Sequence, residues 1–239
     1  MPLPADFSTQ IWNRAQLGNR NRMYNDAGES SEQLQTLARK IAKQCGGKVL
    51  VGSVKNLERA TQKVANDYAG DWTELKDLVR VSIVVPFASM LWRVGLTIQD
   101  HCAQAHTGMA MIKTAETIAP QDVCGYSGLN FVVRLKNGRP GEIQVNTLEM
   151  IYAKMSPEKF KEKLGEWEYY RIKFKYGLEG GLGHALYEIY RREPWSHKGI
   201  EAASLSRMYY DCFRSARESS RVKFVQMEIN KFKPKMGMH

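Results

Sequence analysis

Apolar and polar positions alternate with a period of two along residues 141–147, at the end of a stretch that reads GYSGLNFVVRLKNGRPGEIQVNT over residues 125–147. Two candidate strands, 129–135 and 141–145, flank residues 136–140, which contain an Asn-Gly pair, a strong signal for a tight turn between antiparallel strands. The pattern therefore predicts a β-hairpin.

The second strand of this hairpin carries a polar row. Residues two apart on a strand share a face, so Glu142, Gln144 and Asn146 point the same way, opposite the apolar residues between them. A strand that gives one face to a carboxylate and two amides is typical of a ligand site. An exposed edge strand shows the same pattern, so both interpretations stay open at this point.

Other segments read as helices and short strands. Helical spacing of apolar residues predicts one helix over about 30–44, with a serine cap at its start, and another over about 54–68. Apolar runs predict a short strand at 48–52 and a strand buried in a sheet at 77–86.

Together these elements predict an α/β (α+β) protein, in which a mixed β-sheet of about five strands is flanked by helices. We expect residues 1–28 to form a polar N-terminal segment and residues 29–155 to form the core. Residues 156–239 are predicted to form a basic, helical C-terminal extension that packs on the core.

Composition and charge narrow the class of protein. The chain has 239 residues, 43% of them hydrophobic, which is enough for a large core. It has no apolar run near the roughly 20 residues that span a bilayer, and no secretory signal pattern, so we expect a cytoplasmic protein. The four cysteines form no C-x-x-C pair, which favours buried thiols over zinc ligands or disulfides. A net charge of +10 favours phosphate-bearing partners.

Three cations precede the predicted buried strand. Lys55, Arg59 and Lys63 follow one another at intervals of four, which puts their cationic ends on one side of the predicted helix. Three cations on one face can grip a polyphosphate, and a solvated stripe is the alternative. Asp77 lies at the start of the buried strand, where an unpaired carboxylate is costly, so it needs a cation or a metal as its partner.

A second carboxylate completes a candidate metal site. Asp77 and Glu142, on neighbouring predicted strands, can together hold Mg²⁺, which prefers oxygen ligands and takes much of its shell from substrate phosphates. Arg80 shares a strand face with Ser82, so its guanidinium plane can lie over a base beside the metal, or can instead pair with Asp77. The sequence therefore predicts a site for phosphate chemistry.

Four short motifs follow one another in the sequence: Lys55…Lys63, Asp77-Leu-x-x-x-x-Ile83, Gly125-Tyr126-Ser127 and Glu142-Ile-Gln144-Val-Asn-Thr147. In this order they resemble the synthetase domain of the RelA/SpoT family, which makes (p)ppGpp-type alarmones. The resemblance implies a nucleotidyltransferase-like synthetase fold and the transfer of pyrophosphate from ATP to a ribose 3′-hydroxyl, with release of AMP. It implies no hydrolase activity, because the chain has no adjacent His-Asp dipeptide of the kind that accompanies a hydrolase domain.

The same resemblance implies roles for residues of this sequence. Asp77 and Glu142 would be the catalytic and Mg²⁺-binding carboxylates, and Glu142 would also take the proton from the attacking hydroxyl. The residues implied for ATP binding are Ser53, Lys55, Arg59, Lys63 and Arg80. Those implied for acceptor binding are Tyr126, which would stack on the base, and Asn130, Gln144 and Asn146.

This sequence departs from the family's pattern at both substrates. Ser53 and Ser82 stand where the family commonly has arginines, and Arg80 can replace the arginine that stacks on the donor base. Asn130 and Asn146 stand where the family has His and Arg. These losses weaken the case for GDP or GTP as the acceptor, and the chain looks similar to toxic branches of the family, which modify adenosine nucleotides or the 3′ end of tRNA.

We therefore predict a growth-inhibitory pyrophosphokinase that acts on an adenosine or guanosine nucleotide, with tRNA as the alternative acceptor. The basic C-terminal extension would suit tRNA phosphates, and equally an acidic antitoxin or immunity protein. A non-catalytic nucleotide- or RNA-binding module is the alternative from another class. The two retained carboxylates favour catalysis, since a protein that only binds anions gains from losing acids near the phosphates.

Overall fold

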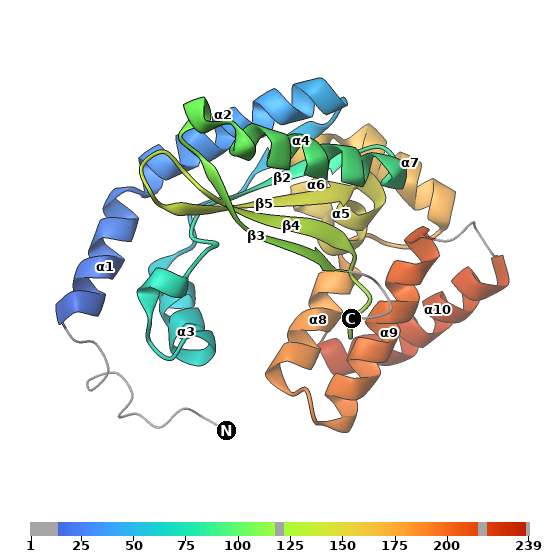
Figure 1. Cartoon of the computed structure of the whole chain (residues 1–239). Coiled ribbons are helices and arrows are strands. Elements are labelled where there is room, and N and C mark those ends of the chain that lie inside the picture. The colour runs from blue at the N-terminus through green and yellow to red at the C-terminus, as the bar shows by residue number, and fades with distance from the viewer. Residues whose placement is uncertain (1–13, 118–121, 215–218, 238–239) are drawn as a thin grey trace. The chain divides into compact units, whose positions relative to one another are not determined.

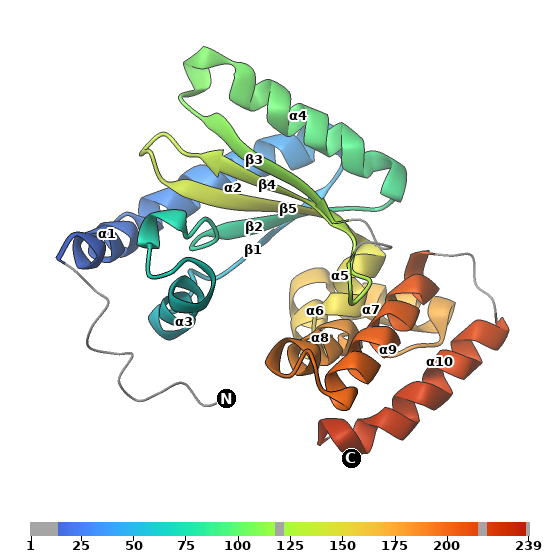
Figure 2. The same ribbon diagram turned by 60° about the horizontal axis from the view of Figure 1, so that its bottom comes forward.

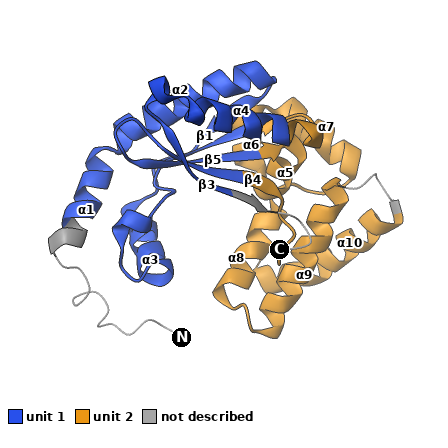
Figure 3. Ribbon diagram, viewed as in Figure 1, with its two compact units in different colours: residues 1–83, 92–115, 130–145 blue, residues 84–91, 116–129, 146–239 orange. Residues whose placement is uncertain are grey.

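The computed structural model (Figure 1) describes residues 14–117, 122–214 and 219–237, so residues 1–13 of the predicted N-terminal segment lie outside it. Contacts divide the chain into two compact units (Figure 3). Unit 1 comprises residues 1–83, 92–115 and 130–145, and unit 2 comprises residues 84–91, 116–129 and 146–239. The predicted domain boundaries after residues 28 and 155 stay a prediction.

Five strands form one sheet in the order β1-β2-β5-β4-β3. The predicted mixed sheet of about five strands flanked by helices is therefore confirmed. The strand that carries the polar row, β5, is paired on both sides, so the explanation of that row as an exposed edge strand is wrong. The strands are β1 (Lys48–Val51), β2 (Arg80–Val85), β3 (Ala110–Thr117), β4 (Gly128–Arg134) and β5 (Pro140–Thr147).

Strands β4 and β5 form the predicted hairpin, and its turn fixes the adjacent helix. Gly138 has φ +79°, a left-handed conformation that glycine adopts at little cost. Nδ2 of Asn137 donates a 3.0 Å hydrogen bond to Oγ of Ser30. Ser30 lies inside helix α2 (Ala27–Cys45), whose N-cap is Asp26. The predicted start of this helix at a serine cap is wrong, because the serine hydroxyl contacts the hairpin instead.

Within unit 1, helices α2 and α4 (Leu91–Ala103) lie over one face of the sheet (Figure 1). The two helices are neighbours, since Sγ of Cys45 on α2 lies 3.5 Å from Oγ1 of Thr97 on α4. Helix α1 (Arg14–Asn25) precedes α2. The apolar side of the sheet is therefore buried beneath a layer of helices.

Glycine packing shows which side of β5 faces that layer. A Cβ on Gly141 would lie 3.1 Å from the methyl carbons of Leu34 on α2, so Gly141 and the alternate residues after it point toward α2. Glu142 and Gln144 consequently point to the opposite face of the sheet. Helix α3 (Leu57–Asp67) lies on that opposite face (Figure 1).

Unit 2 is mainly helical and includes the predicted C-terminal extension, which is confirmed as helical (Figure 2). Aromatic rings fill its interior, and the centroid of Tyr152 lies 5.1 Å from that of Tyr169 and 5.7 Å from that of Phe213. Its helices are α5 (Leu148–Lys154), α6 (Pro157–Leu164), α7 (Glu166–Tyr176), α8 (Leu182–Arg192), α9 (His197–Arg214) and α10 (Ser219–Phe232). Short 3₁₀ turns in the chain are Trp72–Glu74, Ala88–Met90, Ala105–Thr107 and Lys233–Met236.

The thiols behave as the sequence predicts. All four cysteines are buried and none forms a disulfide: Cys45, Cys102, Cys124 and Cys212. Among the described residues, the helices are too short or too polar to cross a membrane.

Candidate active site

Two lysines converge on one carboxylate in unit 1. Nζ of Lys63 lies 3.0 Å from Oδ2 of Asp77, and Nζ of Lys55 donates a short hydrogen bond to the same oxygen. The side chains of Lys55, Lys63 and Asp77 are 16%, 25% and 14% exposed, so water screens these charges only partly. Asp77 therefore has the cationic partners that the sequence required, and neither is Arg80.

Burial and charge set the protonation of this cluster. Burial would raise the pKa of Asp77, but the hydrogen bonds and charges of Lys55 and Lys63 outweigh it and hold that pKa below its usual value. Burial, together with repulsion from Lys63 and Arg80, lowers the pKa of Lys55. The Asp77 carboxylate outweighs burial at Lys63 and raises the pKa of that lysine. Asp77 is thus ionised at neutral pH and holds two like charges together.

Lys55 reaches Asp77 from a loop, which corrects the sequence prediction. Helix α3 begins at Leu57, because the side chain of Asn56 caps it by accepting a 2.9 Å hydrogen bond from the backbone N–H of Arg59. Lys55 therefore precedes the helix, and the predicted stripe of three cations on one helix is wrong. The backbone N–H of Lys55 instead donates a 2.9 Å hydrogen bond to the carbonyl of Leu78.

An aromatic residue outside the predicted motifs fixes this loop. The hydroxyl of Tyr24 on α1 donates a 2.9 Å hydrogen bond to the backbone carbonyl of Lys55. The ring of Tyr24 meets that of Trp72 edge to face, with centroids 6.3 Å apart. The N-terminal helix thus helps to place the first lysine of the cluster.

Asp77 lies before its strand rather than at the strand's start. Strand β2 begins at Arg80, so the predicted start at Asp77 is wrong by three residues. The approach segment is nevertheless extended alongside its neighbours, since the backbone N–H of Glu142 donates a 3.0 Å hydrogen bond to the carbonyl of Val79. Glu142 on β5 therefore lies beside the segment that carries Asp77.

The remaining residues predicted to bind ATP are more exposed. Arg59, in the first turn of α3, and Ser53, in the loop after β1, are both exposed. Arg80 is exposed on β2 and lies across Gly52, where an added Cβ would be 2.9 Å from Cγ of Arg80. Gly52 therefore allows Arg80 to lie close to the backbone of the neighbouring strand. These positions leave the three polar side chains open to a ligand from solvent.

The carboxylates fit a divalent cation that arrives with phosphates. Oδ1 of Asp77 is buried and accepts no hydrogen bond in the described part of the chain, which leaves a carboxylate oxygen free for a cation. Nε2 of Gln144 donates a 3.1 Å hydrogen bond to Oε2 of Glu142. Among the described residues, no three His, Cys, Asp or Glu side chains gather as a metal site, so substrate oxygens would have to complete the shell.

The predicted acceptor residues divide between the units. In unit 2, the hydroxyl of Tyr126 donates a short hydrogen bond to Oδ1 of Asn146, whose side chain is fully buried. Nδ2 of Asn146 has no hydrogen-bond partner among the described residues. In unit 1, Asn130 is half-buried on β4 and Gln144 is half-buried on β5. Asn146 therefore holds the tyrosine, and the polar row of β5 is not uniformly exposed.

Two further contacts of Tyr126 have no counterpart in the predicted motifs. Nζ of Lys154 on α5 lies 4.8 Å from the centroid of the Tyr126 ring, a cation–π contact. The ring of Tyr210 on α9 meets Tyr126 edge to face, with centroids 6.0 Å apart. These partners come from segments far along the chain, which a hairpin pattern cannot anticipate.

Comparison with known proteins assigns a family to this arrangement. No family model matches the chain. The chain is 38% identical, over 194 residues and 81% of its length, to the (p)ppApp synthetase toxin Tas1 of Pseudomonas aeruginosa strain UCBPP-PA14. A crystal structure of the complex between the type VI effector Tas1 and its immunity protein holds a chain that is 36% identical, with a TM-score of 0.70 and coverage of 82% of this chain and 96% of that chain. The chain belongs to the RelA/SpoT family of alarmone synthetases.

The family's fold extends to more distant members. Small alarmone synthetase 1 from Bacillus subtilis is 13% identical, with a TM-score of 0.51 and coverage of 92% of this chain and 98% of that chain. This likeness shows a shared RelA/SpoT-type synthetase fold alone. The chain spans 42% of the length of the Tas1 relative that it matches in sequence.

Proposed function

We propose that the protein is an ATP-dependent pyrophosphokinase, which transfers the β,γ-pyrophosphate of ATP to the ribose 3′-hydroxyl of an acceptor nucleotide and releases AMP. The observation that carries the proposal is the cluster of Lys55, Lys63 and Asp77, beside the strand that carries Glu142. Transfer of this kind depends mainly on positioning and on charge neutralisation, without a covalent nucleophile.

Each donor-side residue has a part that suits its position. Lys55 and Lys63 hold the β- and γ-phosphates, because Asp77 keeps both ammonium groups together and partly shielded from water. Arg59 and Ser53 contact the phosphates from the exposed rim, and the planar guanidinium of Arg80 lies against the adenine ring. Lys55, Lys63 and Asp77 together carry a net positive charge, which the negative phosphates of ATP neutralise on binding.

The carboxylates of Asp77 and Glu142 bind the metal and activate the acceptor hydroxyl. Asp77 and Glu142 would hold Mg²⁺, which neutralises phosphate charge when it is bound. Glu142 takes the proton from the attacking 3′-hydroxyl, and the hydrogen bond from Gln144 orients the carboxylate for this task.

Tyr126 and the amide residues predicted for this role bind the acceptor. The ring of Tyr126 stacks on the base, while Asn130 and Gln144 offer amide groups in place of cations. Asn146 is fully buried and acts through its hydrogen bond with the hydroxyl of Tyr126. Uncharged amides suit an acceptor whose base, rather than its 5′-phosphates, provides the recognition. The relative named as a (p)ppApp synthetase toxin supports an adenosine nucleotide as the acceptor, with a guanosine nucleotide as the next candidate.

Pairing within the C-terminal extension speaks against tRNA. Nζ of Lys235 lies 2.6 Å from a carboxylate oxygen of Glu201, and Nζ of Lys173 lies 2.6 Å from one of Glu179. Cations that are already paired gain less from phosphate contacts than free ones. tRNA is therefore retained as an acceptor to be tested rather than as the preferred one.

Consumption of cellular nucleotides would make the protein a growth-inhibitory toxin that acts in the cytoplasm, where ATP is abundant. A complex of Tas1 with an immunity protein supports a similar neutralising partner for this chain. The net charge of +10 favours an acidic surface on such a partner.

Incubation with γ-labelled ATP, Mg²⁺ and separate acceptors tests the proposal. The panel contains AMP, ADP, ATP, GDP, GTP and bulk tRNA. We expect labelled product with the adenosine nucleotides and less or none with tRNA. Absence of labelled product from every acceptor would refute the proposal. Expression in a bacterium tests the alternative: growth arrest that persists in both Asp77→Ala and Glu142→Gln would favour the non-catalytic binding module.

A further inference from the structure

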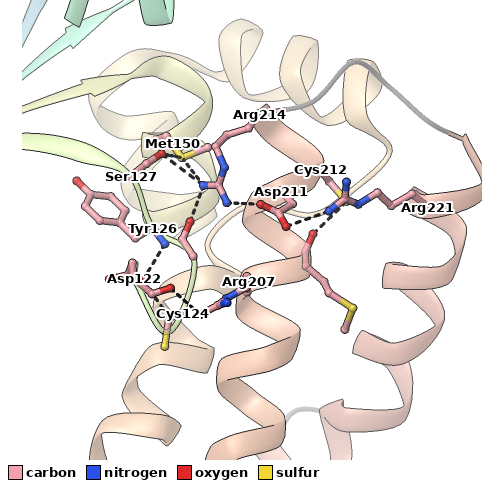
Figure 4. A network of polar contacts seen from close by, with 12 residues as sticks. Asp122, Cys124, Tyr126, Ser127, Met150, Arg207, Asp211, Cys212, Arg214 and Arg221 are labelled. Atoms are coloured by element: carbon pink, nitrogen blue, oxygen red, sulfur yellow. Dashed lines mark hydrogen bonds and ion pairs between the residues drawn. The ribbon is translucent and has the colours of Figure 1, made fainter. Parts of the chain in front are cut away.

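The loop that carries Tyr126 is held by one face of helix α9. Arg207, Tyr210 and Arg214 lie three and four residues apart, a spacing that puts all three side chains on one side of a helix. Figure 4 shows the two arginines reaching from α9 to the loop between Asp122 and Ser127. All of these residues belong to unit 2.

Arg214 makes the central contact. Its Nη1 donates hydrogen bonds to the backbone carbonyl of Gly125 and, at 3.4 Å, to Oγ of Ser127. Its Nη2 is paired with Asp211 on the same helix. The side chain of Arg214 is 23% exposed, so these charge-assisted hydrogen bonds are partly shielded from water. Arg214 therefore joins the helix to the residues on either side of Tyr126 in the sequence.

The start of the loop is tied in the same way. Nη2 of Arg207 donates hydrogen bonds of 3.0 Å and 3.3 Å to the backbone carbonyls of Asp122 and Val123. Oδ1 of Asp122 in turn accepts 3.0 Å hydrogen bonds from the backbone N–H groups of Cys124 and Tyr126. The polar backbone of the loop thus depends on side chains rather than on a neighbouring strand.

Packing leaves little freedom between helix and loop. Gly125 has φ +81°, and a Cβ at this position would lie 2.6 Å from Cα of Arg207. Tyr210, which touches the ring of Tyr126, is itself buried against Gly183, where a Cβ would lie 2.4 Å from the Tyr210 ring. Helix α9 can therefore approach the loop and helix α8 this closely only because residues 125 and 183 are glycines.

A second helix secures the anchor of Arg214. Nη2 of Arg221 on α10 lies 2.9 Å from Oδ2 of Asp211, the carboxylate that also pairs with Arg214. Asp211 is thus shared by arginines from both C-terminal helices (Figure 4). These arginines are engaged within the protein, so they contribute less to a phosphate-binding surface than the charge of the sequence suggests.

We propose that helix α9 sets the position of the acceptor-binding tyrosine, and that Arg214 is a positioning residue for the acceptor nucleotide. The inference rests on the proposed function for its substrate, but the restraint on the loop is a property of the chain itself. A shift of the Tyr126 ring changes how a base stacks on it, while the donor cluster of Lys55, Lys63 and Asp77 lies in the other unit.

Hydrogen–deuterium exchange tests the restraint without any assay of activity. We expect Arg214→Ala to speed exchange of the amides at 122–129 about tenfold, because loss of the anchor raises the population of open loop. Lys198→Ala is the matched control, since it removes one positive charge from the same helix at a residue paired with Glu193. It should leave exchange of the loop unchanged.

Steady-state kinetics tests the link to the acceptor. Arg214→Ala should raise the KM for the acceptor about tenfold and leave the KM for ATP within about twofold of wild type. Arg214→Lys should have a KM for the acceptor between those of wild type and Arg214→Ala. Its single ammonium group cannot contact Gly125 and Asp211 with the geometry of a guanidinium. If Arg214→Ala does not fold, the exchange rates at 122–129 and the two KM values are measured on Arg214→Lys and Asp211→Asn instead.

The outcomes separate the two proposals. Unchanged exchange at 122–129 in the folded variants would overturn the restraint, and an equal rise in both KM values would overturn its specificity for the acceptor. Faster exchange in a protein that makes no product with any acceptor would uphold the restraint and refute the pyrophosphokinase.

Discussion

Lys63 donates a 3.0 Å hydrogen bond to Oδ2 of Asp77 across a separation of 14 residues in the sequence. Nζ of Lys55 donates a hydrogen bond to the same oxygen, so the single negative charge of Asp77 offsets part of the repulsion between the two ammonium groups. This arrangement stabilises the folded chain and concentrates positive charge at one place.

Asp77 should make stability depend on pH in the acid range. Its pKa is lowered in the folded state, so its contribution is present above the ordinary aspartate value of 3.8 and is lost as the pH falls through the lowered value. Asp77→Asn should lower the free energy of unfolding at pH 7 by roughly 1 to 3 kcal/mol and flatten its pH dependence below 3.8. Urea unfolding at several pH values measures both.

An exposed aspartate provides the control for this experiment. Asp67 ends helix α3 and is exposed, so Asp67→Asn removes the same charge without disturbing the lysines. Equal losses of stability in Asp77→Asn and Asp67→Asn would show that the lysine cluster adds nothing to folding.

Glu142 should be needed for turnover and not for folding. Glu142→Gln keeps the shape of the side chain and a partner for Gln144 but removes the proton acceptor and a metal ligand. We expect the turnover number to fall by at least about 100-fold, with a melting temperature close to that of wild type. Gln144→Ala, on the same face of β5, should lower turnover much less. Full activity of Glu142→Gln would remove the carboxylate from the mechanism.

Gly125 should be irreplaceable for two physical reasons. Its φ of +81° disfavours a side chain, and a Cβ would collide with the backbone of Arg207. Gly138→Ala is the matched control, because Gly138 has φ +79° and nothing within 4 Å of its Cβ position. We expect Gly138→Ala to cost about 1 kcal/mol from strain alone, and Gly125→Ala to cost at least about 2 kcal/mol more. Thermal unfolding of both variants checks the difference.

Gly52 should matter for the donor. A Cβ there would lie 2.9 Å from Cγ of Arg80 and 3.0 Å from its carbonyl oxygen, so Gly52→Ala must displace Arg80. We expect the KM for ATP to rise roughly fivefold, with the KM for the acceptor unchanged. Gly28→Ala, in α2 with open space around it, should leave both KM values unchanged and stabilise the helix slightly. A KM for ATP that stays at the wild-type value in Gly52→Ala would remove Arg80 from the ATP site.

Local patterns predicted the hairpin and the sheet because their signals lie within a few residues. The Asn-Gly turn specifies the hairpin of β4 and β5, and the period of two specifies β5, without reference to the rest of the fold. The start of α3 was missed because helical spacing extends back to Lys55, while Asn56 caps the helix later. The pairing of Lys55 with Leu78 overrides that local signal.

The acceptor side was less predictable, because its restraints are distant in the sequence. Tyr126 was identified from its motif, but its contacts with Lys154 and Tyr210 depend on how the helices of unit 2 fold back. The spacing of Arg207, Tyr210 and Arg214 places these residues on one face of α9. A single sequence does not distinguish such a face from a solvated one.

The central claim is that the β,γ-pyrophosphate of ATP is transferred to the acceptor, and the most direct test traces the α- and γ-phosphorus atoms of ATP into the products. The enzyme is incubated with excess unlabelled ADP as the acceptor and with ATP labelled either at the α- or at the γ-phosphorus. The acceptor product, ADP that carries a 3′-diphosphate, is separated from any products of AMP and ATP. If the protein is a pyrophosphokinase, this product should contain γ label and no α label, and the α label of each donor molecule that is used should appear in AMP. Label from the α-phosphorus in the acceptor product, or γ label only in free phosphate, would contradict it.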